Sequence, residues 1–511
     1  MSEPPAPEHR GLQMRTSPPV FFTSAALLVV FLLYGVLAPS HASAIFSTLL
    51  LTVSTYFGWI YVVAIAFFIF GALALLVSPY ARLRLGADDE RPEFSTFTWF
   101  AMLFSAGMGI GLVFYGVAEP MLHLMTPPSG EGNTAAAAHR AMGLTLFHWG
   151  IHAWAIYVLM ALGIAYFSFR KGLPLAIRSC LHPLLGEHIH GWPGHLVDIF
   201  AVFGTLFGLA TSLGLGAMQV SAGLHYLFGW PHDTTTQLIL IAVITLCATV
   251  SLVTGVNHGI RRLSELNIAL AALLLTFVFV VGPTGYILST LGSTVGDYAA
   301  VLIDRTFATQ MSRPAEAKWM RSWTIFYWGW WIAWAPFVGM FVARVSRGRT
   351  IREFILAVLL VPTLVTLVWF SVFGGTALDL QLVAHRGIGA AVENDVSTAI
   401  YVVLSDLPLS SLTSLLAAVV VAVFFVTSSD SASFVVDMLT SGGHPNPPIW
   451  QRIFWATAEG ACAAVLLYAG GKQALQALQA AVVSIGLPFC LVLVATMVSL
   501  VIALREEPRP L

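Results

Sequence analysis

Aromatic side chains concentrate in the stretch "FHWGIHAWAIY" at residues 147–157, and their rings could bind a positively charged group. On a helix that turns about 100° per residue, Trp149, Trp154 and Tyr157 share one side. Indole and phenol faces attract cations, and they suit best a cation that cannot donate hydrogen bonds, such as a quaternary ammonium group. The stretch therefore predicts one side of an aromatic box.

A second aromatic stretch, "WTIFYWGWWIAWAPF" at 323–337, contains five tryptophans. Trp330 and Trp334 lie one helical turn apart, and Trp331 lies beside them. Aromatic stripes at helical spacing usually serve packing, which is the alternative interpretation. Neither stretch contains Asp or Glu as a counter-charge. A cargo that carries its own carboxylate, such as a betaine, therefore fits better than a bare cation.

Hydroxyl groups interrupt the apolar run "FFVTSSDSAS" at 424–433. Four hydroxyls and a carboxylate follow one another there: Thr427, Ser428, Ser429, Asp430 and Ser431. Such a run is unfavourable in lipid without partners or water. Hydroxyl and carbonyl oxygens are hard ligands that suit a cation such as sodium. The run predicts an ion site, although Asp430 could serve only to anchor a helix by hydrogen bonding.

Glycines alternate in the middle of the apolar stretch "FSAGMGIGLVFYGVAE" at 104–119: Gly107, Gly109 and Gly111. Each weakens a helix interior by about 1 kcal/mol relative to alanine. One interpretation is a broken helix whose carbonyls bind a cation and whose backbone approaches a substrate. The other is close helix–helix packing through small residues. Glu119 and Pro120 are expected to end this segment at its extracellular edge.

The composition of the chain indicates that membrane-spanning helices carry these aromatic, hydroxyl and glycine residues. The chain has 511 residues, 58% hydrophobic and 10% charged, with a net charge of −1. A soluble domain carries about 25% charged residues, so this is an integral membrane protein with no electrostatic signature of nucleic-acid binding. Helices are the expected spanning element. Twelve spans are predicted, with centres near residues 29, 62, 108, 154, 210, 246, 276, 332, 365, 422, 460 and 488.

The charged segments between the predicted spans give an orientation. With twelve spans, every second segment lies on the same side of the membrane as the N-terminus, and these segments hold 17 of the 24 Lys and Arg residues. Because basic residues favour the cytoplasmic side, both termini are predicted to be cytoplasmic. The expected parts are a disordered tail (1–19), two N-terminal helices (20–96), spans 3–7 (97–288), an extracellular connection (289–321), spans 8–12 (322–504) and a short tail (505–511). Residues 295–307 of the connection predict an amphipathic helix on the membrane or against another subunit.

The aromatic, glycine and hydroxyl motifs together resemble the betaine/choline/carnitine transporter family. The matching stretches are "GMGIGLVFYGVAEP" (107–120), "FHWGIHAWAIY" (147–157), "GTLFGLATSLGLGAMQ" (204–219), "WTIFYWGWWIAWAPFVGMFVARVSRGRTIREF" (323–354) and "TSSDSAS" (427–433). The resemblance implies an all-α polytopic fold in which two extra helices are followed by two five-helix inverted repeats, spans 3–7 and spans 8–12. It also implies a homotrimer in a bacterial inner membrane.

The resemblance also implies roles for individual residues. Trp149, Trp154 and Tyr157 would form one side of a central box, Trp331 would close it, and Trp334 would line the path toward the cytoplasm. Coupling sodium would be held by main-chain oxygens and hydroxyls of Ser105, Met108, Phe424, Thr427 and Ser428. A second sodium would map near Thr205 and Phe337, but Leu209 stands where the family has a hydroxyl.

The resulting prediction is a secondary transporter that imports a betaine-type onium osmolyte by sodium symport and alternating access, with sodium as coupling ion and no organic cofactor. Gly111 stands where the proton-coupled choline carriers of the family have an aspartate, which favours sodium. The alternatives are proton-coupled choline or carnitine uptake and sodium-independent antiport. An intramembrane enzyme would have only Asp430 with His148 or His152 as a candidate pair, and their spacing gives no support. Whether those histidines relay protons or are structural stays open.

Overall fold

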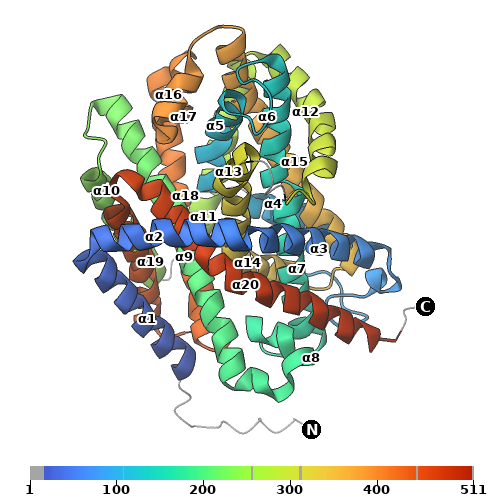
Figure 1. Cartoon of the computed structure of the whole chain (residues 1–511). Helices are drawn as coiled ribbons and strands as arrows, with labels where there is room; N and C mark the ends of the chain where they lie inside the picture. The colour runs from blue at the N-terminus through green and yellow to red at the C-terminus, as the bar shows by residue number, and fades with distance from the viewer. Residues whose placement is uncertain (1–15, 108, 255–256, 310–313, 445–446, 509–511) are drawn as a thin grey trace.

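The computed structural model describes residues 16–107, 109–254, 257–309, 314–444 and 447–508 (Figure 1). These ranges are helical, and their only β-type pairing is an isolated bridge between Arg84 and Thr350. The α-helices are α1 (Pro18–Leu37), α2 (Pro39–Thr52), α3 (Gly58–Val77), α4 (Thr96–Gly107), α5 (Ile110–Met125), α6 (Ala135–Trp149), α7 (Ile151–Ala165), α8 (His182–Leu185), α9 (Trp192–Phe228), α10 (Thr234–Thr254), α11 (Asn257–Val281), α12 (Thr284–Arg305), α13 (Pro314–Ser322), α14 (Thr324–Val345), α15 (Ile351–Leu382), α16 (Ile388–Asn394), α17 (Ala399–Ser405), α18 (Ser410–Thr440), α19 (Ile449–Gly470) and α20 (Ala474–Arg505).

Eleven helical segments of the described chain are long and apolar enough to cross a membrane. They differ from the twelve predicted spans in three ways. The third predicted span is divided into α4 and α5, each of which is too short to qualify. Helix α12, expected in an outer connection, does qualify. Helices α19 and α20 form one run of 57 residues, because only a 3₁₀ turn at Gly471–Gln473 separates them.

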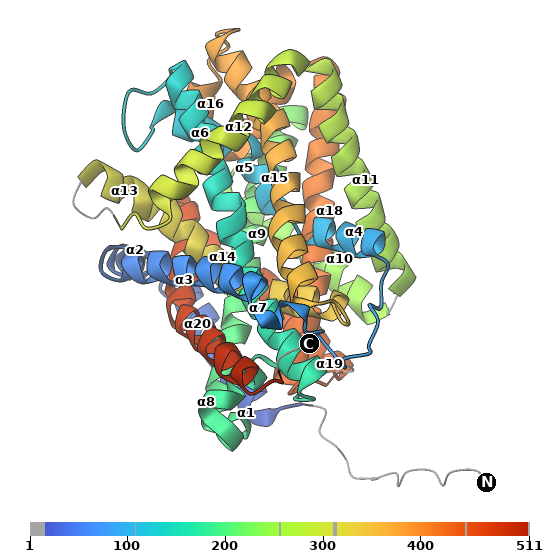
Figure 2. The same ribbon diagram turned by 90° about the vertical axis from the view of Figure 1, so that its right-hand side faces the viewer.

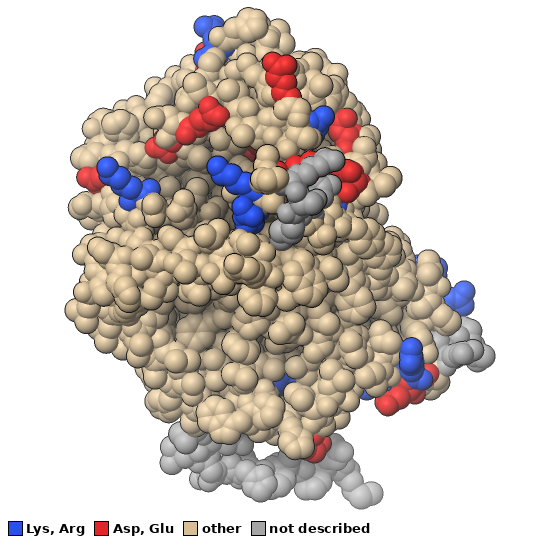
Figure 3. Space-filling model, in the orientation of Figure 1, with Lys and Arg blue, Asp and Glu red and all other residues tan. Residues whose placement is uncertain are grey.

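The helices pack around α9 and α14. Helix α14 packs against α7, α9 and α20, and α9 also packs against α18 and α19. The rod formed by α2 and α3 runs across the outside of this bundle, and α20 lies against it (Figures 1 and 2). Figure 3 shows a broad, largely uncharged zone on this side, with acidic and basic side chains gathered above it and at one lower edge. That distribution is typical of a lipid-facing belt.

Glycine determines where two of the central helices break. Helix α4 ends at Gly107 and α5 begins after Gly109. Between α6 and α7, Gly150 interrupts the helix with φ −98° and ψ −134°. A Cβ atom there would lie 2.5 Å from the Tyr298 hydroxyl, which accepts a hydrogen bond from the freed Ile151 N–H at 2.8 Å. The second break therefore needs a residue without a side chain, and a partner from α12 satisfies its backbone.

Helix α12 contains most of the predicted amphipathic segment, but its apolar face is divided. Tyr298 points inward to the α6–α7 break and is buried. Val295, Ala299 and Ile303 are exposed, and α12 packs through its other side against α6 and α15. The exposed stripe is therefore free to contact lipid or another protein.

Glu507 ties the residues after α20 to the end of the α6–α7 region. Its carboxylate accepts hydrogen bonds from Arg170 Nε at 3.1 Å and Nη2 at 2.8 Å, and from the Tyr166 hydroxyl at 2.9 Å. Lys171 Nζ lies 2.7 Å away. The bonds from Arg170 lower the pKa of Glu507 from its ordinary value of 4.5 to about 2. Because Glu507 itself is buried, this cluster is expected to stabilise the fold.

Replacing Glu507 by Gln should destabilise the protein at neutral pH. The pKa is lower in the folded state, so the stabilisation is complete above about pH 4.5 and is lost as pH falls toward 2. Its upper limit is about 3 kcal/mol. Thermal unfolding in detergent should show a lower Tm for E507Q at pH 7, with the gap to wild type closing below pH 4. The exposed neighbour Glu506 provides the control E506Q, which should match wild type. Equal Tm values for both variants and wild type at pH 7 would contradict this prediction.

Candidate functional site

A cavity of about 190 Å³ lies among α5, the end of α6, α7, α9, α11, α14, α15 and α18. An engineered apolar cavity of about 150 Å³ binds benzene, so this cavity has room for a small organic solute. Thirteen residues singled out in the sequence line it: Gly109, Gly111, Trp149, Trp154, Tyr157, Trp330, Trp331, Trp334, Phe337, Phe424, Thr427, Ser428 and Ser431. The sequence motifs, far apart along the chain, thus meet at one space.

Other predicted residues lie elsewhere. Thr205 is buried in α9 and does not line the cavity, and its hydroxyl donates to Ala201 O at 2.9 Å. Ser105 and Gly107 belong to the last turn of α4. Met108 lies outside the described residues. The carbonyls of the last turn of a helix have no partner within that helix, so the end of α4 offers acceptor oxygens.

Three indole N–H groups of the aromatic wall, those of Trp149, Trp331 and Trp334, donate to acceptors on residues that do not line the cavity. Trp331 Nε1 donates to His148 O at 2.8 Å, and Trp334 Nε1 donates to Gly208 O at 2.8 Å. Trp149 Nε1 donates to Glu119 Oε2 at 2.6 Å. Since these donors are engaged, the rings can offer a ligand only their faces and edges.

The rings also fix one another. Trp331 stacks on Trp330 with centroids 4.9 Å apart, and it meets Trp149 edge-on at 4.9 Å. Trp154 and Tyr157, which also line the cavity, meet edge-to-face at 5.2 Å. Such packed aromatic pairs are rigid, so the box is formed in advance of any ligand.

Helix α18 divides its hydroxyls between two sides. Thr427, Ser428 and Ser431 line the cavity. Ser429 and Ser433 instead donate to Glu459 Oε2 of α19, at 3.0 and 2.8 Å. Only part of the hydroxyl run is therefore available to an ion in the cavity.

Asp430 also points away from the cavity. It accepts a hydrogen bond from Ser251 of α10 at 3.1 Å. This contact matches the expectation that Asp430 could anchor a helix.

Neutral side-chain oxygens face the cavity. Thr427 Oγ1 donates to Val423 O at 3.1 Å and keeps its lone pairs for a cation. Asn267 of α11, with its amide oriented to match its neighbours, donates to Val420 O and accepts from Phe424 N, both at 3.2 Å. It therefore competes with the backbone hydrogen bond of α18 one turn before Thr427. Neutral oxygens of this kind are ligands that sodium prefers.

Sequence reasoning missed several lining residues, among them Ser212, Ser264, Asn267, Phe341 and Thr366. A single polar residue in an apolar span was the available signal for Asn267. Ser212, Ser264, Phe341 and Thr366 gave no such signal. Serine, threonine and phenylalanine are common in membrane helices, where they usually pack against neighbours or bond to their own helix.

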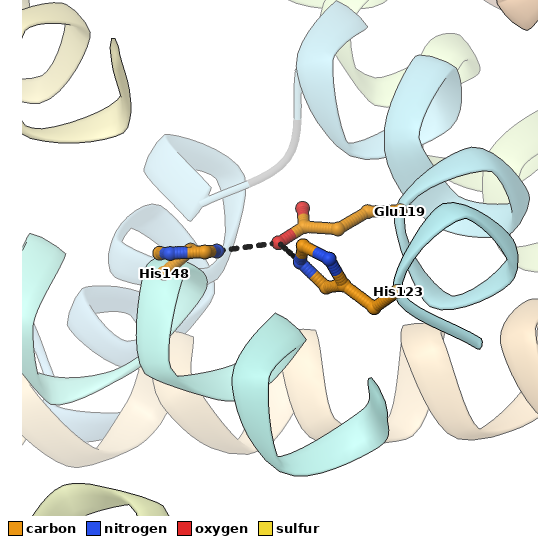
Figure 4. A group of neighbouring side chains, drawn as sticks. All are labelled: Glu119, His123 and His148. Carbon is orange, nitrogen blue, oxygen red and sulfur yellow. Dashed lines mark hydrogen bonds and ion pairs between the residues drawn. The ribbon is translucent and has the colours of Figure 1, made fainter. Parts of the chain in front are cut away.

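The expectation for Glu119 was wrong. Helix α5 continues through Pro120 to Met125, so it does not end at Glu119, whose side chain is fully buried. Its carboxylate accepts hydrogen bonds from His148 Nδ1 at 2.6 Å and His123 Nε2 at 3.2 Å (Figure 4). It also accepts one from Trp149 Nε1. Proline is tolerated inside membrane helices where neighbours satisfy the freed backbone, so it did not mark the end.

The two histidines of the first aromatic stretch have structural partners. His148 lies between Glu119 and the Thr324 hydroxyl, which is 3.1 Å from its Nε2. His152 Nε2 lies 3.1 Å from the Thr306 hydroxyl, beyond the end of α12, and its ring stacks on Trp328 at 5.4 Å. Both therefore tie the box helices to their neighbours.

The family model and the similar proteins all point to one family of membrane transporters. The pattern of BCCT, the betaine/carnitine/choline family transporter group, matches residues 19–509. Glycine betaine transporter 1 of Vibrio parahaemolyticus is 47% identical over 495 residues, covering 96% of this chain and 94% of that protein. Glycine betaine transporter OpuD of Bacillus subtilis is 45% identical, covering 96% and 95%. A probable glycine betaine transporter of Desulfitobacterium hafniense is 43% identical, covering 96% and 97%.

Adding a methyl group at Gly111 should disturb the aromatic wall. A Cβ atom there would lie 2.7 Å from Trp330 Cη2 and 3.0 Å from Trp149 Cη2. Overpacking of this kind costs about 1–3 kcal/mol, so G111A should lower the Tm and alter tryptophan emission without any ligand. At Gly109 a Cβ atom would meet nothing within 4 Å, so G109A is the matched control and should leave both measurements unchanged. A wild-type Tm and spectrum for G111A would show that this packing is wrong.

Proposed function

The chain belongs to the betaine/carnitine/choline transporter family, and we propose that it imports a betaine-type zwitterion by sodium symport. It is a multi-pass membrane transporter, and the relatives named above are transporters, not enzymes. The observation that carries the proposal is a cavity lined by aromatic rings, in which the N–H groups of Trp149, Trp331 and Trp334 are bonded to residues outside the lining. Such a surface suits a quaternary ammonium head that donates no hydrogen bonds.

The charge of the cavity favours a zwitterion as substrate. None of the described residues that line it is Asp, Glu, Lys or Arg. A bare cation would therefore lose its hydration with no direct counter-charge, whereas a betaine is neutral overall. Helix α5 begins at the cavity with Gly109, Ile110 and Gly111, and the first N–H groups of a helix lack partners within it. These N–H groups can receive the carboxylate of the substrate.

The proposed sodium site lies between the break after α4 and the cavity face of α18. Its ligands would be main-chain oxygens of Ser105, Met108 and Phe424 with the hydroxyls of Thr427 and Ser428. One sodium ion moving down about 100 mV releases roughly 2.3 kcal/mol, and a tenfold gradient adds about 1.4 kcal/mol. Together they could drive several-hundredfold accumulation of a neutral solute. A second ion near Thr205 and Phe337 has less support, because Thr205 does not line the cavity and Leu209 stands where the family has a hydroxyl.

The exposed side of the cavity supports alternating access. Ser431 is exposed, and Trp334, Phe337 and Phe341 are partly exposed toward the C-terminal halves of α14 and α18. Under the positive-inside orientation those halves face the cytoplasm. The opposite end is filled by the buried rings of Trp330 and Tyr327. We infer an inward-facing state of a carrier that closes this path and opens the other.

The arrangement proposed from the family is twelve spans, with spans 3–7 and 8–12 as inverted repeats, in a bacterial plasma membrane with both termini inside. A homotrimer is proposed as well. The apolar stripe Val295, Ala299 and Ile303 on α12 supports it, since an exposed face of this kind can contact a second copy.

Betaine uptake into reconstituted vesicles should require an inward sodium gradient. Thr427→Ala and Ser428→Ala each remove one proposed ligand, and each should raise the sodium concentration for half-maximal uptake about tenfold, or roughly 1.4 kcal/mol. Thr276→Ala is the control, because Thr276 is exposed and bonds only to Ala272 O of its own helix. Uptake driven by a proton gradient, or exchange without any ion, would instead support the proton-coupled or antiport alternatives.

Trp331 should contribute its ring face to substrate affinity. Trp331→Leu should raise the Kd for glycine betaine at least tenfold, since a cation–π contact contributes roughly 0.5–2 kcal/mol and the wall also loses its stacking on Trp330. Trp331→Phe loses the same N–H bond to His148 but keeps a ring face, so it should lose less than Leu. Isothermal titration would measure both. Equal losses for Phe and Leu would assign the effect to the hydrogen bond.

A further inference from the structure

Glu119 has a bonding pattern that links it directly to the aromatic box. Oε2 accepts from Trp149 Nε1 at 2.6 Å and from the Tyr327 hydroxyl. Oε1 faces His148 Nδ1 at 2.6 Å and His123 Nε2 at 3.2 Å (Figure 4). One oxygen thus serves the box and the other serves the histidines.

The hydrogen-bond network fixes the state of His123. Trp319 Nε1 donates to His123 Nδ1 at 3.3 Å, and an indole N–H can only donate. His123 Nδ1 is therefore an acceptor, which assigns the proton to Nε2 and makes this ring neutral. His123 Nε2–H then donates to Glu119, as the Trp149 and Tyr327 groups do. A carboxyl group that faces donors at both oxygens is best matched as the ionised carboxylate.

A metal ion does not fit among Glu119, His123 and His148, although their ligand atoms lie within 4.8 Å of one another. Two ligands of a tetrahedral zinc ion lie roughly 3.4 Å apart, given metal–ligand distances near 2.1 Å. The 2.6 Å between His148 Nδ1 and Glu119 Oε1 is the length of a charge-assisted hydrogen bond instead. The cluster is therefore best described as a buried anion held by donors.

The anion contacts the two rings that flank Trp331. Tyr327 lies nearly parallel to Trp331 with centroids 5.7 Å apart, and Trp149 meets Trp331 at 4.9 Å. Hydrogen bonds polarise one another in a low-dielectric interior. An indole N–H or phenol O–H bonded to a carboxylate makes the ring more electron-rich, and an electron-rich face attracts a cation more strongly.

We propose that Glu119 is a specificity-determining positioning residue: its buried charge, transmitted through Trp149 and Tyr327, makes the box prefer a cationic head over a neutral head of the same shape. The inference rests on the proposed function, because it concerns the same substrate site. It gives the box the negative potential that its lining residues lack, and it holds Trp149 in the orientation that forms the wall.

The test compares glycine betaine with 3,3-dimethylbutanoate, in which carbon replaces the charged nitrogen while the shape and carboxylate remain. The variant is Glu119→Gln, whose amide oxygen can still accept from Trp149 and Tyr327. His148 can accept from the Gln amide N–H if its proton moves to Nε2, toward Thr324. The variant therefore removes the charge and keeps both bonds to the box, while the bond from His123 Nε2–H is lost because that group then faces the amide N–H.

Competition against labelled betaine should give a Kd at least tenfold higher for betaine in E119Q, with less than a twofold change for 3,3-dimethylbutanoate. Equal losses for both compounds, or no loss for either, would overturn the proposal. So would a stoichiometric transition metal, found by elemental analysis in the wild type and missing in E119Q. Wild-type protein that binds neither compound would refute the proposed function instead.

A second variant keeps the inference testable where E119Q does not fold. Tyr327→Phe removes one of the two bonds that connect the charge to the box and leaves the ring in place. It should lower the ratio of betaine affinity to isostere affinity about threefold. An unchanged ratio in Y327F, measured in protein with a wild-type Tm, would count against transmission through the rings.

Discussion

The requirement that every backbone polar group find a partner in lipid governs this structure. Helices satisfy it within themselves, and the described chain is built of almost nothing else. Places where a helix is interrupted are therefore informative, and two such breaks lie at or next to the cavity. The break between α4 and α5 brings a helix N-terminus to the cavity, and the break at Gly150 follows Trp149 directly. Both leave backbone groups that need other partners, at the place where a polar solute would be bound.

The same requirement explains how so many indoles can surround one small space. A buried N–H without a partner costs about 1–3 kcal/mol, so each tryptophan needs an acceptor. The acceptors of Trp331 and Trp334 are backbone carbonyls of His148 and Gly208, and that of Trp149 is a carboxylate. All three lie behind the wall. Because the polar edge of each of these three rings is bonded behind the wall, only the apolar part of the ring is left for the cavity, and the chemistry of the box is a consequence of its packing.

Much of the fold and the main site could be predicted because the signals were periodic and local. Long apolar runs predicted the helices, and two aromatic stripes predicted rings that do line one cavity. What failed depended on partners distant in sequence. Glu119 looked like a helix end because Glu-Pro is a common boundary, yet donors from α6 and α14 allow it to be buried. Asn267 contacts the backbone of α18 across 150 residues of sequence, and no local pattern indicates that pairing.

The hydroxyl run on α18 shows why a motif and a site are different things. At about 100° per residue, Thr427, Ser428 and Ser431 fall within one arc, while Ser429 and Ser433 fall together on another. The first arc meets the cavity and the second meets Glu459 of α19. One short segment therefore contacts both the cavity and the helix behind it, so a ligand that shifts α18 must also alter how Glu459 is held. Helical geometry alone makes those two contacts inseparable.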